Sequence, residues 1–273
     1  MAIYVYTWAD LNNVRNNLNE DVILMNNLDE NTEGYDTYAS SNANDGAGWL
    51  PIGTYSSSFT GTFNGNGYKI KGLYINSPST DYVGIFGKVY WAYDGKFIKN
   101  LTIENFNITG RNNVGCLIGY WDYGDDINLL IDNITLNNVV CNGGQLYLKG
   151  GGLIGEICQK GGIRETYKIT NIKGYINSIS GGGYIGGVVG YGGSAYMENV
   201  DIQVGTISGS SCVGGVLGEG ADMVVKKSRI EILNKVEATH TAGGSAGGFC
   251  GRQGFFYECY VYGNGKVVGN KRV

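Results

Sequence analysis

The stretch "GGVVGYGG", residues 186–193, holds five glycines in eight positions and no charged side chain. Glycine loses more conformational freedom on folding than any other residue, so a glycine-dense phrase indicates a local need for it. The phrase returns as "GGLIG" ending at Gly155, "GGVLG" at Gly218 and "GGFCG" at Gly251, and in looser form as "VGIFG" at Gly87 and "GCLIG" at Gly119. A unit of about thirty residues therefore recurs six times, which is the signature of a repeat architecture.

A second phrase follows each glycine-rich phrase and alternates apolar and polar residues, as in "LTIENFNI". Such alternation predicts a strand, and no unit carries a helical pattern. In the first four units an asparagine holds the same place: Asn100, Asn133, Asn171 and Asn199. Asparagine tolerates the left-handed backbone of a turn and can bond to its counterpart in the next repeat. The units are predicted to stack as coils of a parallel β-solenoid.

The residues just before each anchor glycine form columns. Three residues before the anchor stand Gly84, Cys116, Gly152, Gly187, Gly215 and Gly248, and four before it stand Val83, Gly115, Gly151, Gly186, Gly214 and Gly247. Two apolar columns lie between: Ile85/Leu117/Leu153/Val188/Val216/Phe249 and Phe86/Ile118/Ile154/Val189/Leu217/Cys250. Neighbouring strand residues point to opposite faces, so both columns enter one core only if the chain bends between them. We expect such a corner; the alternative is an apolar stripe on the surface that serves as an interface.

Composition excludes several classes of protein. The chain has 273 residues with 47 Gly and 2 Pro, and its net charge is −4 with 20 Lys and Arg. Without a basic cluster, neither nucleic acid nor anionic lipid is an expected partner. No stretch approaches a membrane span, and "MAIYVYTWADLNNVRNN" at the start does not resemble a signal peptide. The six cysteines lie in apolar contexts without CxxC spacing, which favours buried small hydrophobes over a disulfide or a zinc site.

The front of the chain differs from the repeats. Thr7 and Asp10 form a capping signal, and Leu11, Val14 and Leu18 follow at helical spacing, so a helix is predicted over 8–18. This helix would cover the open end of the first coil. We assign one domain, 1–273: cap helix and first strand at 5–25, a polar insertion at 26–58, coils at 59–262 and a C-terminal end at 263–273.

The segments "GWLPIG" (48–53) and "FTGTFNGNGYKIKGLYI" (59–75) come next. With the glycine-rich phrases they resemble the GLUG-repeat proteins over roughly residues 5 to 262. The resemblance implies an all-β fold, a single-stranded right-handed parallel β-helix of the pectate-lyase type with a short N-terminal capping helix. It implies bacterial or archaeal surface proteins and viral appendages, and it supplies no catalytic residues.

Candidate catalytic and metal-binding residues are few. Asp125 and Asp126 in "YGDDIN" look like one motif of polygalacturonase-type hydrolases, but the Gly-His-Gly of that family is absent and His240 is expected in an exposed loop. The loop "DENTEG" from Asp29 resembles half of a calcium loop, with Ser40 where the bidentate glutamate should stand. We therefore expect no enzymatic activity, no bound metal and no cofactor.

The residues directly after the anchor glycines are polar or aromatic: Lys88, Tyr120, Glu156, Tyr191, Glu219 and Arg252. Stacked coils should align them in a ladder facing water, either as a solvated stripe or as a shallow groove that binds host-surface glycans. For glycan binding we select Tyr120, Glu156, Tyr191, Glu219 and Arg252.

We expect a non-catalytic tail- or capsid-attached virion component of a prokaryotic virus. Its partners would be host-cell surface glycans, other virion proteins or a second copy in a homo-oligomer, with no nucleic acid and no membrane insertion. The alternatives are an extracellular or cell-surface adhesin and a polysaccharide hydrolase or lyase.

Overall fold

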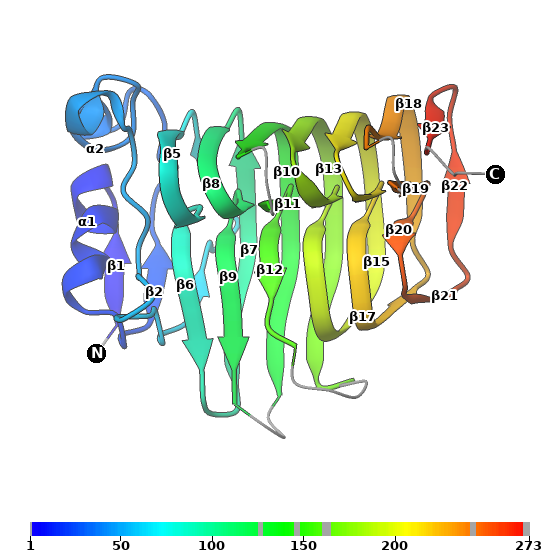
Figure 1. The fold of residues 1–273 in the computed structure, drawn as a ribbon. Helices are drawn as coiled ribbons and strands as arrows, with labels where there is room; N and C mark the ends of the chain where they lie inside the picture. The colour runs from blue at the N-terminus through cyan, green and yellow to red at the C-terminus, as the bar shows by residue number, and fades with distance from the viewer. Residues whose placement is uncertain (1, 125–127, 145–147, 160–164, 241–243, 270–273) are drawn as a thin grey trace.

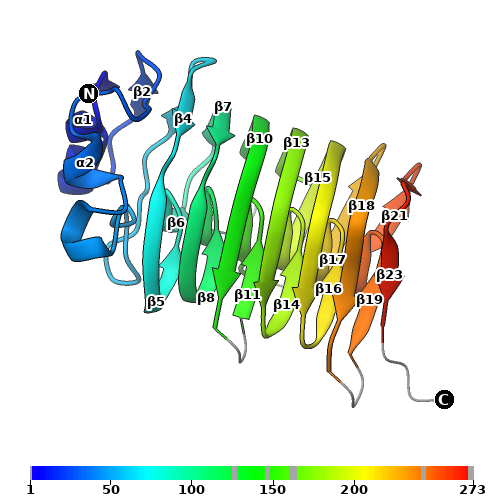
Figure 2. The same cartoon turned by 90° about the horizontal axis from the view of Figure 1, so that it is seen from above.

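The computed structural model describes residues 2–124, 128–144, 148–159, 165–240 and 244–269. The protein is a parallel β-helix in which 61% of residues are in strands and 7% in helices. Figure 1 shows successive coils stacked along one axis from the N-terminal end to the C-terminal end. From above, β5, β8, β10, β13, β15 and β18 lie side by side (Figure 2). The predicted all-β solenoid is confirmed.

The elements follow one another in chain order. The cap and its surroundings hold β1 (Ile3–Val5), α1 (Trp8–Asn13), the 3-10 turn η1 (Val14–Asn16), β2 (Val22–Leu24), α2 (Tyr35–Tyr38) and η2 (Ala43–Gly46). The first full coils hold β3 (Phe63–Asn64), β4 (Lys69–Lys71), β5 (Tyr74–Val83), β6 (Phe86–Trp91), β7 (Lys96–Glu104), β8 (Asn107–Gly115) and β9 (Ile118–Tyr123). The middle holds β10 (Leu129–Gly143), β11 (Leu148–Gly151), β12 (Ile154–Ile157), β13 (Tyr167–Gly181), β14 (Gly183–Gly186) and β15 (Val189–Gly209). The last coils hold β16 (Cys212–Gly214), β17 (Leu217–Lys226), β18 (Arg229–Ala238), β19 (Ser245–Gly247), β20 (Cys250–Arg252), β21 (Phe255–Tyr257), β22 (Tyr260–Tyr262) and β23 (Lys266–Val268).

Both apolar columns beside the anchor glycines point into the core. Leu117 and Ile118, which are neighbours in the chain, are both fully buried, and so are Leu153 and Ile154. The chain therefore turns between them, as the corner hypothesis requires, and the alternative of an exposed apolar stripe is wrong. In later coils the corner lies between two successive strands, for example between β11 and β12.

The glycines allow this corner to close. A Cβ on Gly155 would lie 2.6 Å from the backbone of Asn113 and Val114 in the preceding coil. A Cβ on Gly151 would meet the carbonyl oxygen of Val188, 2.6 Å away in the following coil. Backbone atoms cannot yield as side chains do, so only glycine fits where the two strands approach so closely.

The first coil departs from the column alignment. Val83 pairs with Val114, not with Gly115, while Phe86 pairs with Ile118 as expected. Two residues thus lie between the paired positions in the first coil and three in the next. The placement of Val83 and Gly84 was wrong by one residue, because the first corner is one residue shorter than the others.

The asparagine turns are as predicted. Asn100, Asn133, Asn171 and Asn199 all have left-handed φ angles between 53° and 57°. Asn133 Nδ2 donates to Asn100 Oδ1 over 2.9 Å, and Asn199 Nδ2 donates to Asn171 Oδ1 over 3.2 Å. Asn171 Nδ2 instead donates to Asp132 Oδ1. In the next coil Lys227, within the "KKS" segment, takes the place of the asparagine, and its φ is also left-handed.

The N-terminal end is closed by more than one helix. Thr7 and Asp10 form the predicted capping box, but α1 ends at Asn13 and a 3-10 turn ends at Asn16, so the helix is shorter than the predicted 8–18. Strand β1 precedes the helix and pairs with β2. The segment 26–58 is not merely polar, because it supplies buried Trp49, whose ring lies 6.1 Å from that of Trp8.

The opposite end of the described residues is formed by short strands. Strand β23 pairs with β18, so the coils continue to Val268 and not to 262 as predicted. Large apolar side chains of these last strands are exposed: Phe255, Tyr257, Tyr260, Val261, Tyr262, Val267 and Val268. The two ends of the solenoid therefore differ, one covered by helices and one presenting strands.

Candidate functional site

The residues after the anchor glycines form one continuous ladder across six strands. Lys88 pairs with Tyr120, Tyr120 with Glu156 and Glu156 with Tyr191. Tyr191 then pairs with Glu219, and Glu219 with Arg252. The predicted alignment is correct, and five steps of about 4.8 Å make the ladder about 24 Å long. In Figure 1 its strands β6, β9, β12, β15 and β17 lie side by side toward the viewer.

A second row lies across the corner from this ladder. It comes from the strands that precede the corner, and its members follow from the pairing of β5, β8, β11, β14, β16 and β19. We call it the opposite row: Tyr82, Asn113, Lys149, Tyr184, Cys212 and Ser245. The sharp glycine corner brings the two rows together, so their side chains contact one another.

Aromatic rings dominate the N-terminal part of the two rows. The rings of Tyr82 and Tyr120 are 5.6 Å apart, and Tyr55 stacks on Tyr82 with centroids 5.9 Å apart. The Lys88 ammonium lies 4.6 Å from the centroid of Tyr55 and also bonds to Asp122. Since Tyr55 is mostly exposed, this aromatic cluster reaches from the ladder into solvent.

Glu156 is the centre of the middle part. Its carboxylate forms an ion pair of 2.7 Å with Lys149 and accepts a hydrogen bond from Asn113 Nδ2. The Lys149 ammonium also lies 5.0 Å from the ring centroid of Tyr191, whose hydroxyl donates to Gln159 Oε1. Lysine thus joins an acidic and an aromatic member of the ladder.

The C-terminal part carries a second carboxylate. Glu219 lies 3.7 Å from the Arg252 guanidinium and accepts a contact of 3.6 Å from the Cys212 thiol. Tyr184 and Tyr191 meet edge to face with centroids 5.5 Å apart. Burial, together with the charges of Glu219 and Glu156, raises the pKa of Tyr191. The Glu219–Arg252 pair expected from the sequence is present.

The ladder is more covered than a shallow open groove would be. Glu219 is only 8% exposed, and Tyr120, Glu156 and Tyr191 are half-buried, whereas the Arg252 side chain is 58% exposed. The opposite row causes this, and sequence reasoning missed it. A signal was available, because Lys149 and Tyr184 hold one place in their units, two residues before the glycine pair.

The other sequence candidates give no second site of this kind. Asp125 and Asp126 lie outside the described residues. His240 is exposed in a loop, as predicted. Asp29 uses its carboxylate to accept bonds from the Asn31 amide and the Thr32 hydroxyl, which is a turn arrangement. Within the described ranges no three His, Cys, Asp or Glu side chains gather as a metal site.

The cysteines match their predicted burial only in part. Cys116, Cys141 and Cys212 are buried, but Cys158, Cys250 and Cys259 are partly exposed.

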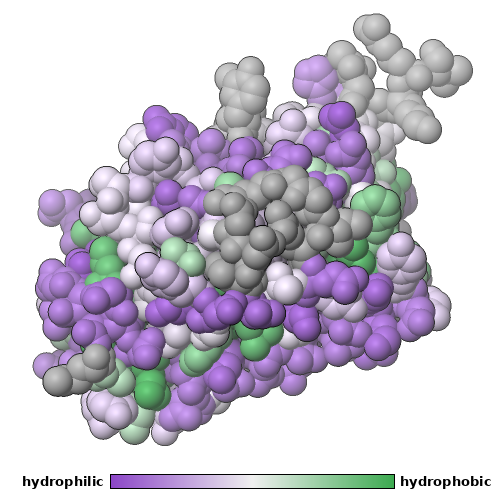
Figure 3. Space-filling view, turned by 90° about the horizontal axis from the view of Figure 1, so that it is seen from below, coloured by the Kyte–Doolittle hydropathy of each residue, from purple (hydrophilic) through white to green (hydrophobic). Residues whose placement is uncertain are grey.

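None of the helices that the structure describes is long and apolar enough to cross a membrane. The face seen from below is mostly hydrophilic with separate small apolar areas (Figure 3).

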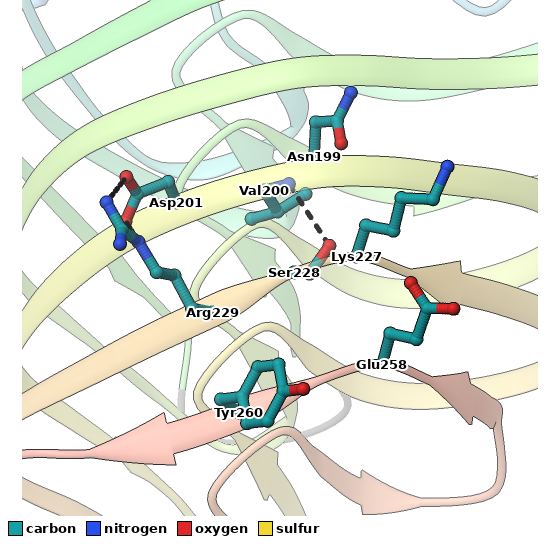
Figure 4. Close-up of a pocket in the computed structure, with 8 residues that line it drawn as sticks. All are labelled: Asn199, Val200, Asp201, Lys227, Ser228, Arg229, Glu258 and Tyr260. Carbon is teal, nitrogen blue, oxygen red and sulfur yellow. Dashed lines mark hydrogen bonds and ion pairs between the residues drawn. The ribbon is translucent and has the colours of Figure 1, made fainter.

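A depression of about 510 Å³ near the end of the asparagine turns was not predicted. Figure 4 shows Asp201 and Arg229 paired on one side of it, Lys227 and Glu258 on the other, and Tyr260 below. Three of the charged side chains here are already paired, because Arg229 bonds to both Asp201 oxygens and Lys227 bonds to Glu198 over 2.9 Å. We regard the two rows as the stronger candidate site.

Comparison with known proteins supports the fold. No family model matches the chain. A "putative immunoglobulin A1 protease" from Bacteroides ovatus has a similar structure, with a TM-score of 0.62, 16% identity and coverage of 99% of this chain and 78% of that one. At this identity the likeness shows a shared fold and says nothing of activity.

Two curated proteins are similar in sequence. A "Putative Gly-rich membrane protein" of Evansella cellulosilytica is 33% identical over 135 residues, 48% of this chain and 14% of that protein. "Halomucin" of Haloquadratum walsbyi is 33% identical over 115 residues, 41% of this chain and 1% of that protein. The matches thus cover less than half of this chain and a small part of much longer proteins.

Proposed function

We propose that the protein is a non-catalytic, adhesive β-solenoid displayed at a cell surface, and that the ladder with its opposite row binds surface glycans. The observation that carries the proposal is the register of the ladder, which sets tyrosines and carboxylates alternately over three consecutive coils. Tyr120, Glu156 and Tyr191 succeed one another at the spacing of stacked strands. Aromatic faces suit sugar rings, and carboxylates accept hydrogen bonds from hydroxyl groups.

The regular spacing favours a polymer over a small molecule. A ladder about 24 Å long repeats similar contacts along one direction, so a linear polysaccharide could meet several of them at once. Because the two rows contact each other, we place the sugar chain over their joint outer edge, where Tyr55 and Arg252 are most exposed. Weak contacts with several sugar units of one polysaccharide would together give tighter binding than any single contact.

The proposed location follows the similar proteins. Their names denote a membrane protein and a halomucin, which supports the cell-surface alternative over the virion component that we expected first. The virion assignment and the GLUG resemblance remain predictions. The polysaccharide hydrolase or lyase also stays an alternative, because its candidates Asp125 and Asp126 lie outside the described residues; the ladder carboxylates are paired, Glu156 with Lys149 and Glu219 with Arg252.

The test replaces Tyr120 and Tyr191 together with alanine. Binding to polysaccharides on a glycan array should fall at least tenfold for this double variant, because each substitution removes an aromatic ring on which a sugar would stack. Tyr120→Phe with Tyr191→Phe should keep most of the binding, since the rings remain. Tyr93→Ala with Tyr260→Ala, at exposed tyrosines away from the ladder, is the matched control.

Far-UV circular dichroism must show the same β-sheet spectrum for all three variants. If the Tyr120/Tyr191 alanine variant folds and binds like the parent, the ladder is only a surface and the proposal is wrong. Release of reducing ends or unsaturated sugars by the parent would instead support a catalytic role.

A further inference from the structure

Two cysteines occupy positions where their neighbours in other coils are different. Cys116 stands three residues before its anchor glycine, where the four following coils have Gly152, Gly187, Gly215 and Gly248. Cys141 stands in a core column of β-branched residues, in register with Ile108 and Ile179, and that column continues through Ile207 and Val236. Both departures fall in adjacent coils.

The two departures meet inside the core. Cys116 and Cys141 are 0% and 1% exposed, and their sulfur atoms are 3.3 Å apart. Cys116 follows β8, whereas Cys141 belongs to the part of β10 that pairs with β8 in the next coil. The contact therefore joins two stacked coils.

The direction of the Cys116 side chain follows from the corner. A Cβ at the same place in the next coils would lie against the coil that follows: at Gly152 it would overlap the Gly187 carbonyl oxygen and be 2.9 Å from Ile176 Cδ1. A side chain at this position thus reaches toward a strand of the following coil. Cys141 lies in the coil that follows Cys116, where the next coil has Ile179, and its smaller side chain leaves room for Cys116. Two facing thiols are also the pair that can be joined covalently.

We propose that Cys116 and Cys141 form a disulfide that links two neighbouring coils of the solenoid. The oxidant is a low-molecular-weight disulfide. The thiolate of one cysteine attacks it, forming a mixed disulfide and releasing one thiol. The thiolate of the other cysteine then attacks the sulfur of the first, forming the Cys116–Cys141 bond and releasing the second thiol. The two thiol protons end on the two released thiols.

Burial determines when this bond forms. Burial is the main cause that raises the pKa of the Cys116 thiol, and the neighbouring Cys141 raises it further. The reactive thiolate is therefore disfavoured in the folded core, and the oxidant has no path to it. The bond is expected to form during folding, before the coils close. It should then be shielded from reductants for as long as the chain stays folded.

The experiment refolds the full chain from denaturant with a mixture of oxidised and reduced glutathione, then denatures it in the presence of iodoacetamide. Four cysteines should be alkylated, and mass spectrometry of a proteolytic digest should find one cross-linked pair containing Cys116 and Cys141. Reduction before alkylation should modify all six. Refolding with reductant alone should give the same fold, with an unfolding equilibrium constant about 100-fold larger.

The control Cys116→Gly with Cys141→Ile restores the residue types of the neighbouring coils. Its unfolding midpoint should be the same with and without the disulfide mixture, whereas that of the parent should rise when oxidised. The proposal is overturned if the refolded parent carries six alkylated cysteines, if other cysteines form the cross-link, or if its midpoint is as indifferent to reductant as that of the control. In that case Cys141 only makes room for the Cys116 side chain in the core. Neither result bears on glycan binding.

Discussion

At the scale of single residues, the turns of this solenoid depend on asparagine. A left-handed backbone costs an ordinary L-residue about 1 kcal/mol or more, and asparagine is one of the few that adopts it readily. Here the side chain also connects coils: Asn171 Nδ2 donates to Asp132 and its Oδ1 accepts from Asn199. One residue therefore fixes both the turn and its distance from the next coil.

Asn171→Ala should lower the free energy of unfolding by about 2 kcal/mol, because it strains the turn and removes hydrogen bonds. Asn171→Gly should cost about half of that, since glycine accepts the positive φ of 56° and only the side-chain bonds are lost. Urea denaturation of both variants measures the difference. Equal losses for Ala and Gly would show that the left-handed backbone carries no cost at this turn.

At the scale of elements, the corner between strands is set by missing side chains. A Cβ on Gly155 would lie against the backbone of Asn113 and Val114, and the same strand, β12, carries Glu156 of the ladder. The same approach that closes the corner brings the ladder against its opposite row. Fold and candidate site therefore share one determinant.

Gly155→Ala should destabilise the protein by about 3 kcal/mol, because the new Cβ would lie 2.6 Å from backbone atoms that cannot move independently. Gly124→Ala is the control. Its Cβ would meet Ala92 at 3.3 Å, and its φ is not in the left-handed range, so the cost should stay below 1 kcal/mol. Thermal unfolding followed by circular dichroism compares them; similar melting temperatures would argue against a backbone-limited corner.

At the scale of the whole molecule, the core is continuous and unusually aromatic near its middle. Trp91 and Trp121 meet edge to face 5.6 Å apart, Trp121 contacts Tyr123, and Tyr123 packs on Tyr167. The Tyr123 hydroxyl is satisfied in this core, because the carbonyl oxygens of Cys158 and Ser194 in later coils share its one proton, over 2.7 Å and 2.9 Å. Several coils thus depend on a phenol that must stay neutral.

Stability should fall at alkaline pH for this reason. Burial, the largest cause, raises the pKa of Tyr123 above its usual 10.0, so the unfolded chain loses the phenol proton first. Its stabilising effect is complete below pH 10 and is lost as the pH rises from there toward the folded pKa, by at most about 1.4 kcal/mol per pH unit. Denaturant unfolding at several pH values, with tyrosinate absorbance, measures this.

Tyr123→Phe separates the contribution of the Tyr123 hydroxyl from that of other tyrosines. It should cost about 1 kcal/mol at neutral pH, because two carbonyl groups lose their donor, and it should lessen the alkaline loss. Tyr93→Phe, at a tyrosine that is 75% exposed, should change neither. An unchanged alkaline profile in Tyr123→Phe would assign the effect to other tyrosines whose pKa is raised by burial, such as Tyr120 and Tyr191 of the ladder.

The sequence alone determined the repeat, the asparagine turns and the alignment of the ladder, because these follow from period and residue type within one unit. It missed what depends on contacts between units. The opposite row, the burial of Glu219, the shorter first corner and the Cys116–Cys141 contact appear only when the glycine corner folds one strand against another. Trp49 in a segment read as polar is similar, since its burial depends on the cap that forms around Trp8. Periodicity specifies where each residue stands in a coil, while the angle at the corner decides which distant residues meet.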